Sequence, residues 1–167
     1  SLVHDGDLDL ANDYALVYGF DVDSPEGRAW VAPRLTPTGR VRTLMPIGPA
    51  IAWAPAYAVA TGVGGGERLS EVAPGLTGVA AATMAAWLML SIAARLIDRS
   101  AAIVGVLGVW LGSHALYYSL ISPAYSHAMS MLATSLVVTH WCRAHGRWRL
   151  GPAAVSGALV GVAALMR

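Results

Sequence analysis

Two long stretches of the chain carry no charged side chain. The first lies between Glu71 and Arg95, and its segment 75–94 has about the twenty residues that a helix needs to cross a hydrocarbon layer about 30 Å thick. The second stretch, between Arg99 and Arg143, has 43 residues. As one helix it would reach about 65 Å at about 1.5 Å per residue, which is twice that thickness. We therefore predict one span at 75–94 and a fold-back within the second stretch.

The fold-back is predicted at the sequence SPAYSH, residues 122–127. Pro123 has no backbone N–H and disfavours helical angles at the residue before it. The hairpin is then a helix over 100–121, a turn, and a helix over 126–142. A fourth apolar run, 150–166, is short for a span. The pattern thus predicts an all-α fold, a polytopic transmembrane helical bundle whose abundant Gly and Ala allow close helix packing.

The apolar segment 44–66 is interrupted by Pro46, Pro49 and Pro55. Of the ten Arg that precede the terminal Arg167, nine lie inside and one outside if this segment crosses the membrane; if it re-enters, residues 1–74 are external and the split is five and five. The preference for basic residues on the cytoplasmic side favours the first arrangement. Three closely spaced prolines argue against a straight spanning helix, because a broken helix at membrane depth lines a cavity or packs on protein. Charge and helix chemistry therefore leave the topology open.

Composition and charge support a membrane protein. Hydrophobic residues make up 56% of the chain, charged residues 13%, and the mean hydropathy is +0.55, whereas about a quarter of a soluble domain is charged. The short connections 95–99 and 143–149 carry five Arg between them, which favours the cytoplasmic side and puts 122–127 outside. We expect membrane lipid as a partner and no nucleic acid.

Smaller observations concern the source and the extent of the chain. All eleven basic residues are Arg, which indicates a GC-rich coding bias and a bacterial source. The single cysteine, Cys142, excludes an intramolecular disulfide, and no Cys/His spacing indicates zinc. The chain starts at Ser1 without an initiator Met, so we expect a fragment of a longer protein.

Aspartate is concentrated at the start of the chain, at positions 5, 7, 9 and 13. The D-x-D-x-D spacing is typical of a calcium loop, but Leu10 and Leu16 stand where an EF-hand needs Gly and a bidentate Glu. A solvated acidic loop is an alternative interpretation. Against it, the segment also carries Leu8 and Tyr14, which indicates partial packing. The residues alone leave both interpretations in place.

Three motifs together resemble a known family: DGDLDLANDY (5–14), MPIGPAIAWAPAY (45–57) and SPAYSHAMS (122–130). They resemble bacterial multi-pass glycosyltransferases of the GT-C fold, in glycosyltransferase family 39, the protein mannosyltransferase and aminoarabinose transferase-like group. The resemblance covers nearly the whole chain. It implies an external loop, 1–74, that includes short juxtamembrane helices and a juxtamembrane or re-entrant helix at 44–66, followed by transmembrane helices in 75–167. The chain would then be multi-pass in the cell (inner) membrane, with 1–74 and 122–127 external.

The resemblance also implies roles for individual residues. In that family an acid of the first external loop works at the catalytic centre, and Asp5 is our candidate for it as general base. Asp7 is its partner or a metal ligand, so Asp5 and Asp7 are also candidates to hold a divalent cation. A carboxylate beside the acceptor hydroxyl can take its proton during attack on the anomeric carbon. Arg suits the departing phosphate, and Arg34 is the candidate among the four basic residues of 28–42.

Further substrate-binding candidates are weighed against plain structural roles. Asp9 and Asp13 are weaker acids of the same cluster, and Asn12 and Tyr14 either bond sugar hydroxyls or fix the turns of the loop. His4 either shuttles a proton or is a hydrogen-bonded structural residue. At the hairpin corner, Tyr125 and His127 either face substrate or anchor the interface. His114, in the middle of 100–121, is predicted to point into the bundle as a structural residue. These candidates are His4, Asp9, Asn12, Asp13, Tyr14, Arg34, Tyr125 and His127.

The leading functional hypothesis is a membrane glycosyltransferase. It would move a sugar from a polyprenyl-phosphate donor to an acceptor glycan, lipid or protein on the outer face. An alternative is a transporter fragment in which the proline-broken segment and the external acids form a cation-binding vestibule. A third is a structural membrane subunit whose acidic loop docks a basic partner.

Overall fold

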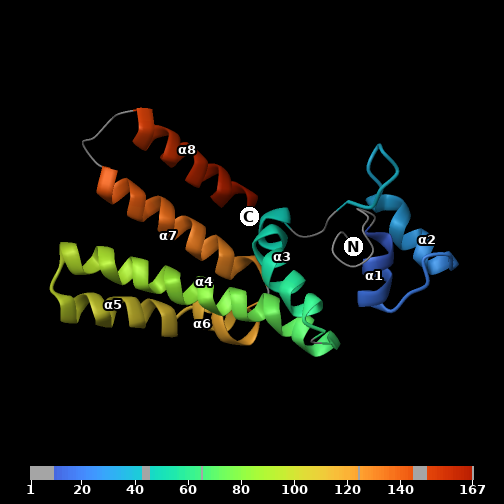
Figure 1. Cartoon of the computed structure of the whole chain (residues 1–167), viewed down its shortest axis with the longest axis horizontal. Helices are drawn as coiled ribbons and strands as arrows, with labels where there is room; N and C mark the ends of the chain where they lie inside the picture. Colours follow the sequence, from blue (N-terminus) through green and yellow to red (C-terminus); the bar gives the residue numbers. More distant parts are fainter. Residues whose placement is uncertain (1–9, 43–45, 65, 124, 145–149, 167) are drawn as a thin grey trace. The chain divides into compact units, whose positions relative to one another are not determined.

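The regular elements of the chain are helices. The computed structural model describes residues 10–42, 46–64, 66–123, 125–144 and 150–166, and within these ranges the only β pairing is an isolated antiparallel bridge, Leu35 to Val41. The prediction of an all-α fold is confirmed. The chain divides into two compact units, Ser1–Met45 (unit 1) and Pro46–Arg167 (unit 2), drawn in Figure 1.

Unit 1 contains α1 (Ala11–Tyr18), α2 (Pro25–Val31) and the 3-10 turn η1 (Ala32–Arg34). Helix α1 ends at Gly19, whose φ of 69° is left-handed and favours glycine. Helix α2 starts at an N-cap, where the Ser24 hydroxyl accepts the Gly27 N–H at 2.9 Å and Pro25 occupies the first turn. Gly27 is buried against the backbone carbonyl of Asp21, so the turn between the helices leaves no room for a side chain there.

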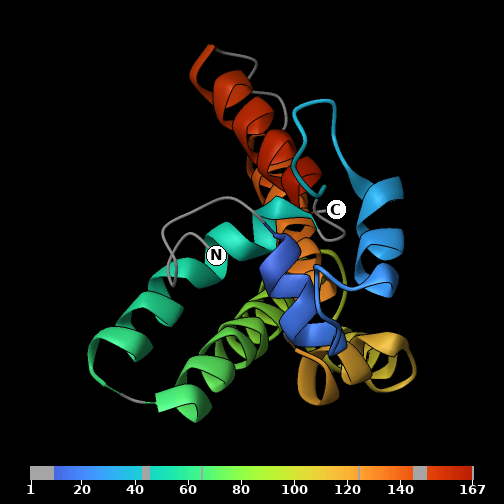
Figure 2. The same ribbon diagram turned by 90° about the vertical axis from the view of Figure 1, so that its right-hand side faces the viewer.

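Unit 2 is a helical bundle. Helices α4 and α7 run side by side in the same direction, and α5 and α8 return beside them (Figure 1). Helix α3 leads into α4 through a short connection, and Figure 2 shows α3 running outward and α4 returning. The bounds are α3 (Ile47–Gly62), α4 (Gly66–Leu96), α5 (Arg99–Leu111), α6 (His114–Leu116), the π-helical η2 (Tyr117–Ile121), α7 (Ser126–Ala144) and α8 (Leu150–Leu165).

This arrangement gives unit 2 two chemically distinct ends. The basic end holds Arg95, Arg99 and Arg143, where α4 and α7 finish and α5 begins. The corner end holds η2, the turn at Pro123 and the start of α7. The start of α3 lies at the corner end too, because Gly48 packs against the backbone carbonyl of Leu165, in the last turn of α8. The described residues of the two basic connections, Arg95–Arg99 and Arg143, thus lie at the same end of unit 2, away from Pro123.

The helix predicted over 100–121 is bent in the structure. Its two parts, Arg99–Leu111 and His114–Ile121, meet at 72°. The second part starts with an N-cap, in which the Ser113 hydroxyl accepts the Ala115 N–H at 3.1 Å. Across the bend, the Trp110 indole N–H donates to the Ser119 hydroxyl at 3.0 Å. Gly112 and Ser113 therefore interrupt a stretch that its hydrophobicity predicted to be one continuous helix.

The interior of unit 2 is built from small side chains. The buried apolar residues of α4, α5 and α7 are mostly alanines, at positions 73, 81, 82, 85, 102, 128 and 133. Large apolar side chains face outward instead, with Val104 71%, Val109 70% and Leu150 92% exposed. Small residues at helix interfaces are typical of helices that pack in lipid, because they let backbones approach closely.

Length and apolarity identify few candidate membrane spans. Arg68–Leu96 is long and apolar enough to cross a membrane, and the bent pair 99–111 and 114–121 would make a second crossing if it acts as one span. Helix α8 is apolar but shorter. Helix α3 has 16 residues and reaches about 24 Å, less than a hydrocarbon core of about 30 Å. The described residues are thus weakly compatible with membrane association.

Candidate functional site

The acids predicted to carry catalysis lie at the start of unit 1. His4, Asp5, Asp7 and Asp9 fall outside the described residues, and the side chain of Asp13, in α1, does so too. Within the ranges that the structure describes, no group of three or more His, Cys, Asp or Glu side chains is placed to hold a metal ion. The roles of Asp5 and Asp7 as general base and cation ligands therefore stay predictions.

Unit 1 is organised around the indole of Trp30. Tyr14 and Tyr18, one helical turn apart on α1, lie with ring centroids 5.4 and 5.6 Å from that of Trp30, and Phe20 lies at 5.0 Å. Tilted aromatic pairs at these distances each add about 0.5–1.5 kcal/mol beyond their buried area. Sequence reasoning missed Trp30, although the i, i+4 spacing of the two tyrosines was a signal that one face of a helix is aromatic.

Two of the predicted substrate-binding residues meet at this indole. The guanidinium carbon of Arg34 lies 4.0 Å from the centroid of the Trp30 ring, a cation–π contact, and its Nη1 donates to the Trp30 carbonyl. Tyr14 contacts the same ring system. Asn12 is exposed in the first turn of α1. Arg34 thus has a packing role in unit 1, and phosphate binding by this residue stays a prediction.

The hairpin corner brings the other two predicted residues together. The His127 ring lies 3.9 Å, centroid to centroid, from that of Tyr118, and the Tyr125 ring lies 6.2 Å from it. Tyr117 meets Tyr118 edge to face at 5.2 Å. We call these four residues, Tyr117, Tyr118, Tyr125 and His127, the aromatic corner. Tyr118 is its centre, because its ring contacts those of the other three residues.

The aromatic corner is open to its surroundings and stands on unusual backbone. Tyr117 is 46% and Tyr125 49% exposed, so both side chains are partly accessible. Tyr117 and Tyr118 belong to η2, a π-helical turn, and such turns occur frequently at functional sites. Flat ring faces with polar groups at their edges can stack on a ligand and hydrogen-bond its rim. Chemically, the corner can hold a small polar ligand but offers no strong nucleophile.

His114 does not have its predicted position. It was expected in the middle of a helix, pointing into the bundle, but it is exposed and is the first residue of α6. The break at Gly112 and Ser113 ends α5 before this residue is reached. His114 is therefore a helix-start residue at a bend, not an interhelical contact.

Comparisons with known proteins identify no relative of this chain. No protein-family model, no curated protein and no solved structure matches the chain. A functional assignment consequently rests on the chain's own motifs and on the arrangement of unit 2.

Proposed function

We propose that the chain is part of a membrane glycosyltransferase of the GT-C type, a polytopic helical protein. It moves a sugar from a polyprenyl-phosphate donor to an acceptor on the outer face. The observation that carries this proposal is the composition of the corner end of unit 2. That end combines an accessible aromatic corner with the point where the chain arrives from the aspartate-bearing segment, and the basic residues gather at the other end.

The start of α3 supports an entry of the chain into unit 2 on the side of the aromatic corner. Pro49 is fully buried, and Gly48 packs on the Leu165 carbonyl, so the first turn of α3 is fixed at the corner end. The Ser130 hydroxyl donates to the Met166 carbonyl at 2.8 Å, which joins α7 and α8 at the same end. The chain therefore enters unit 2 where Tyr125 and His127 lie.

The distribution of apolar surface supports a lipid environment. Unit 2 buries alanines and exposes Val, Leu and Ile, an arrangement that water disfavours and lipid does not. Helix α3 is about 24 Å long and contains Pro55, which favours a position at the edge of the membrane over a full crossing. In that position residues 1–74 and the turn at 122–127 are both external.

The proposed transfer involves two bonds and one proton. The acceptor hydroxyl attacks the anomeric carbon, a new C–O bond forms, and the bond from that carbon to the phosphate oxygen breaks. Asp5 takes the hydroxyl proton, and the phosphate leaves with the electron pair. The aromatic corner offers ring faces for the sugar, with the Tyr125 hydroxyl and the His127 imidazole at its edge. Asp5 and Asp7 remain the candidate ligands of a divalent cation.

Transfer by single-residue variants of the natural protein tests this proposal. Membranes containing it are supplied with radiolabelled polyprenyl-phosphate mannose or aminoarabinose, and label is counted in glycan, lipid and protein fractions. Asp5→Asn should abolish transfer, because the amide cannot accept the proton, and Asp7→Asn should reduce it. The control is Asp23→Asn, which removes a carboxylate from an exposed residue of unit 1. Normal transfer by Asp5→Asn at equal expression would overturn the assignment of the base.

One observation favours a second candidate, a transporter fragment. The 72° break between α5 and α6 resembles the discontinuous helices that bind ions in many transporters. Against it, Ser119 at this break is 1% exposed and already bonded to Trp110 and to the Ala115 carbonyl, so its hydroxyl is engaged within the bend. Cation flux into proteoliposomes that is lost in Asp7→Asn, without sugar transfer by the parent protein, would favour the transporter.

A further inference from the structure

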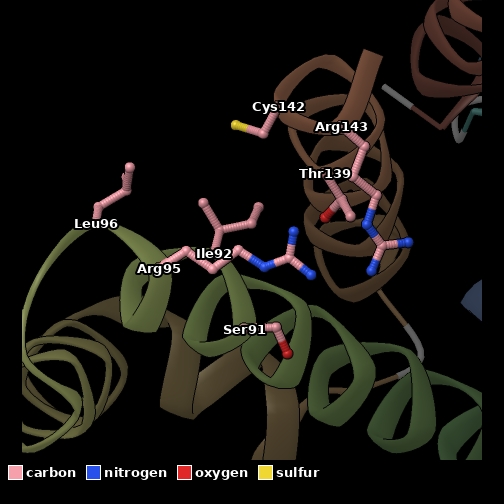
Figure 3. A pocket seen from close by; sticks show the side chains of 7 residues that line it. All are labelled: Ser91, Ile92, Arg95, Leu96, Thr139, Cys142 and Arg143. Atoms are coloured by element: carbon pink, nitrogen blue, oxygen red, sulfur yellow. The ribbon is translucent and has the colours of Figure 1, made fainter. Parts of the chain in front are cut away.

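A pocket of about 190 Å³ lies between the last turns of α4 and α7, at the basic end of unit 2. Figure 3 shows that Arg95 and Arg143 reach into it from the two helices, with their guanidinium groups turned toward each other. Apolar Ile92 and Leu96 form part of the wall, and the pocket is partly open.

In the part of the chain that the structure describes, the two guanidinium groups lack a counter-charge. Among the residues that the structure describes, neither Arg95 nor Arg143 has an ion-pair partner. The nearest acid in the sequence is Asp98, and its carboxylate caps α5 by accepting the N–H groups of Ser100 at 2.9 Å and Ala101 at 3.3 Å. Two like charges that face one space repel each other unless an anion lies between them. The pocket therefore favours an anionic occupant.

The hydroxyl groups of the pocket limit which donors are left to bind an anion. Ser91 donates its hydroxyl hydrogen to the Trp87 carbonyl at 2.8 Å, and Thr139 donates to the Ser135 carbonyl at 2.7 Å. Both hydroxyls are thus committed as donors within their own helices. The free donors are the guanidinium N–H groups, five on each side chain, in the planar geometry that matches phosphate oxygens.

We propose that this pocket binds the phosphate group of an anionic membrane lipid, held between Arg95 and Arg143. The Arg68–Leu96 helix is long and apolar enough to cross a membrane and ends at the pocket, which puts the guanidinium groups at headgroup level. Leu96, 76% exposed, lies where the acyl side of a lipid would meet the protein. Basic pockets between membrane helices on the cytoplasmic side are suited to lipid phosphates. This site does not require the sugar transfer proposed above.

The native thiol of Cys142 reports occupancy, because this exposed residue lines the same pocket. The natural protein, purified in a neutral detergent, is treated with N-ethylmaleimide, an uncharged reagent, with and without short-chain phosphatidylglycerol. Bound lipid should slow modification of Cys142 at least fivefold, and short-chain phosphatidylcholine should not. Inorganic phosphate forms a separate arm: protection by phosphate alone, at concentrations no higher than those of the lipid, would overturn the lipid as the occupant.

Variants distinguish binding in this pocket from a general attraction of the anionic lipid to basic residues. Protection by phosphatidylglycerol should disappear in Arg95→Gln/Arg143→Gln and persist in Arg99→Gln, which removes an exposed positive charge at the same end but outside the pocket. Arg95→Lys/Arg143→Lys should protect weakly, since lysine keeps the charge but not the paired geometry. Unchanged helicity by circular dichroism shows that each variant folds. Equal protection in the parent and the double Gln variant, or none in the parent, would overturn the proposal.

Discussion

The two ends of unit 2 differ in how closely their residues pack and in the charge that they carry. At the corner end, backbone touches backbone where Gly78 of α4 meets the Pro123 carbonyl, and Pro49 and Ser119 are fully buried. At the basic end, Leu96 is 76% exposed and Arg95 and Arg143 face each other across an open pocket. The same set of helices thus forms a closely packed end with clustered aromatic rings and an open end with two facing guanidinium groups.

The largest expected contrast comes from truncating one side chain at each end. Met129, in the first turn of α7, is 4% exposed, and Met129→Ala should lower the free energy of unfolding by about 2–5 kcal/mol because it leaves a cavity. Leu96→Ala, at the basic end, should change it by less than about 0.5 kcal/mol. Unfolding in mixed micelles with increasing denaturing detergent measures both. Equal losses would show that the two ends are packed alike.

The contact between α4 and the corner turn can be broken with a single methyl group. A Cβ at Gly78 would meet the backbone carbonyl of Pro123, so Gly78→Ala should cost about 1–3 kcal/mol. The matched control is Gly75→Ala, one turn earlier on the same helix, where the nearest atom is Pro123 Cγ at an ordinary 3.6 Å. There the gain in helix propensity, up to about 1 kcal/mol, should dominate. A stabilising Gly78→Ala would contradict the close approach seen at this end.

The bend between α5 and α6 depends on one buried hydroxyl. Ser119→Ala removes the acceptor of the Trp110 indole N–H; a fully buried donor left unpaired costs about 1–3 kcal/mol, and the half-buried Trp110 should cost about 1 kcal/mol. Adding Trp110→Phe removes the stranded donor, so the double variant should lose less than the sum of the single losses. Thermal unfolding of the four proteins, followed by circular dichroism, gives this double-mutant cycle. Additive losses would mean that the bond does not hold the bend.

The smallest effect is expected at the aromatic corner. His127→Ala removes the ring that lies 3.9 Å from Tyr118 and should cost about 0.5–1.5 kcal/mol. His127→Phe keeps a ring and should restore most of this stability without the imidazole. If the corner holds the sugar, both variants should raise the KM for the polyprenyl-phosphate sugar, although only His127→Ala loses stability. A KM that rises only in the destabilised His127→Ala variant would indicate that the corner has a purely structural role.

Hydrophobic runs predicted the helical fold and the corner turn but not every helix limit. Helix α4 starts at Gly66, nine residues before the predicted span, because polar residues such as Arg68 and Ser70 are compatible with helix even though they do not favour membrane. Pro74 lies within this helix, where the sequence suggested a boundary. The break at Ser113 did carry a signal: a Gly-Ser pair in an apolar run supplies a helix end and an N-cap.

The candidate site was predictable in its residues but not in its contacts. Tyr125 and His127 were found because they lie beside the proline turn, yet their common neighbour Tyr118 lies before that turn, in the π-helical η2, which the sequence pattern did not predict. The pairing of Arg95 with Arg143 depends on α4 and α7 running parallel, which sequence spacing does not specify. Contacts between distant segments therefore required the fold.

Labelling from outside the cell tests the central claim most directly, namely that the early acids and the corner share the outer side while the basic end faces inward. Single cysteines are placed in the Cys142→Ser background by Asp9→Cys and by Ala124→Cys, and the parent protein supplies Cys142 itself. In intact cells, a membrane-impermeant thiol reagent should label positions 9 and 124, and it should label Cys142 only after permeabilisation. Label at 124 with protection at position 9 would contradict this arrangement, and with it the proposed centre of sugar transfer.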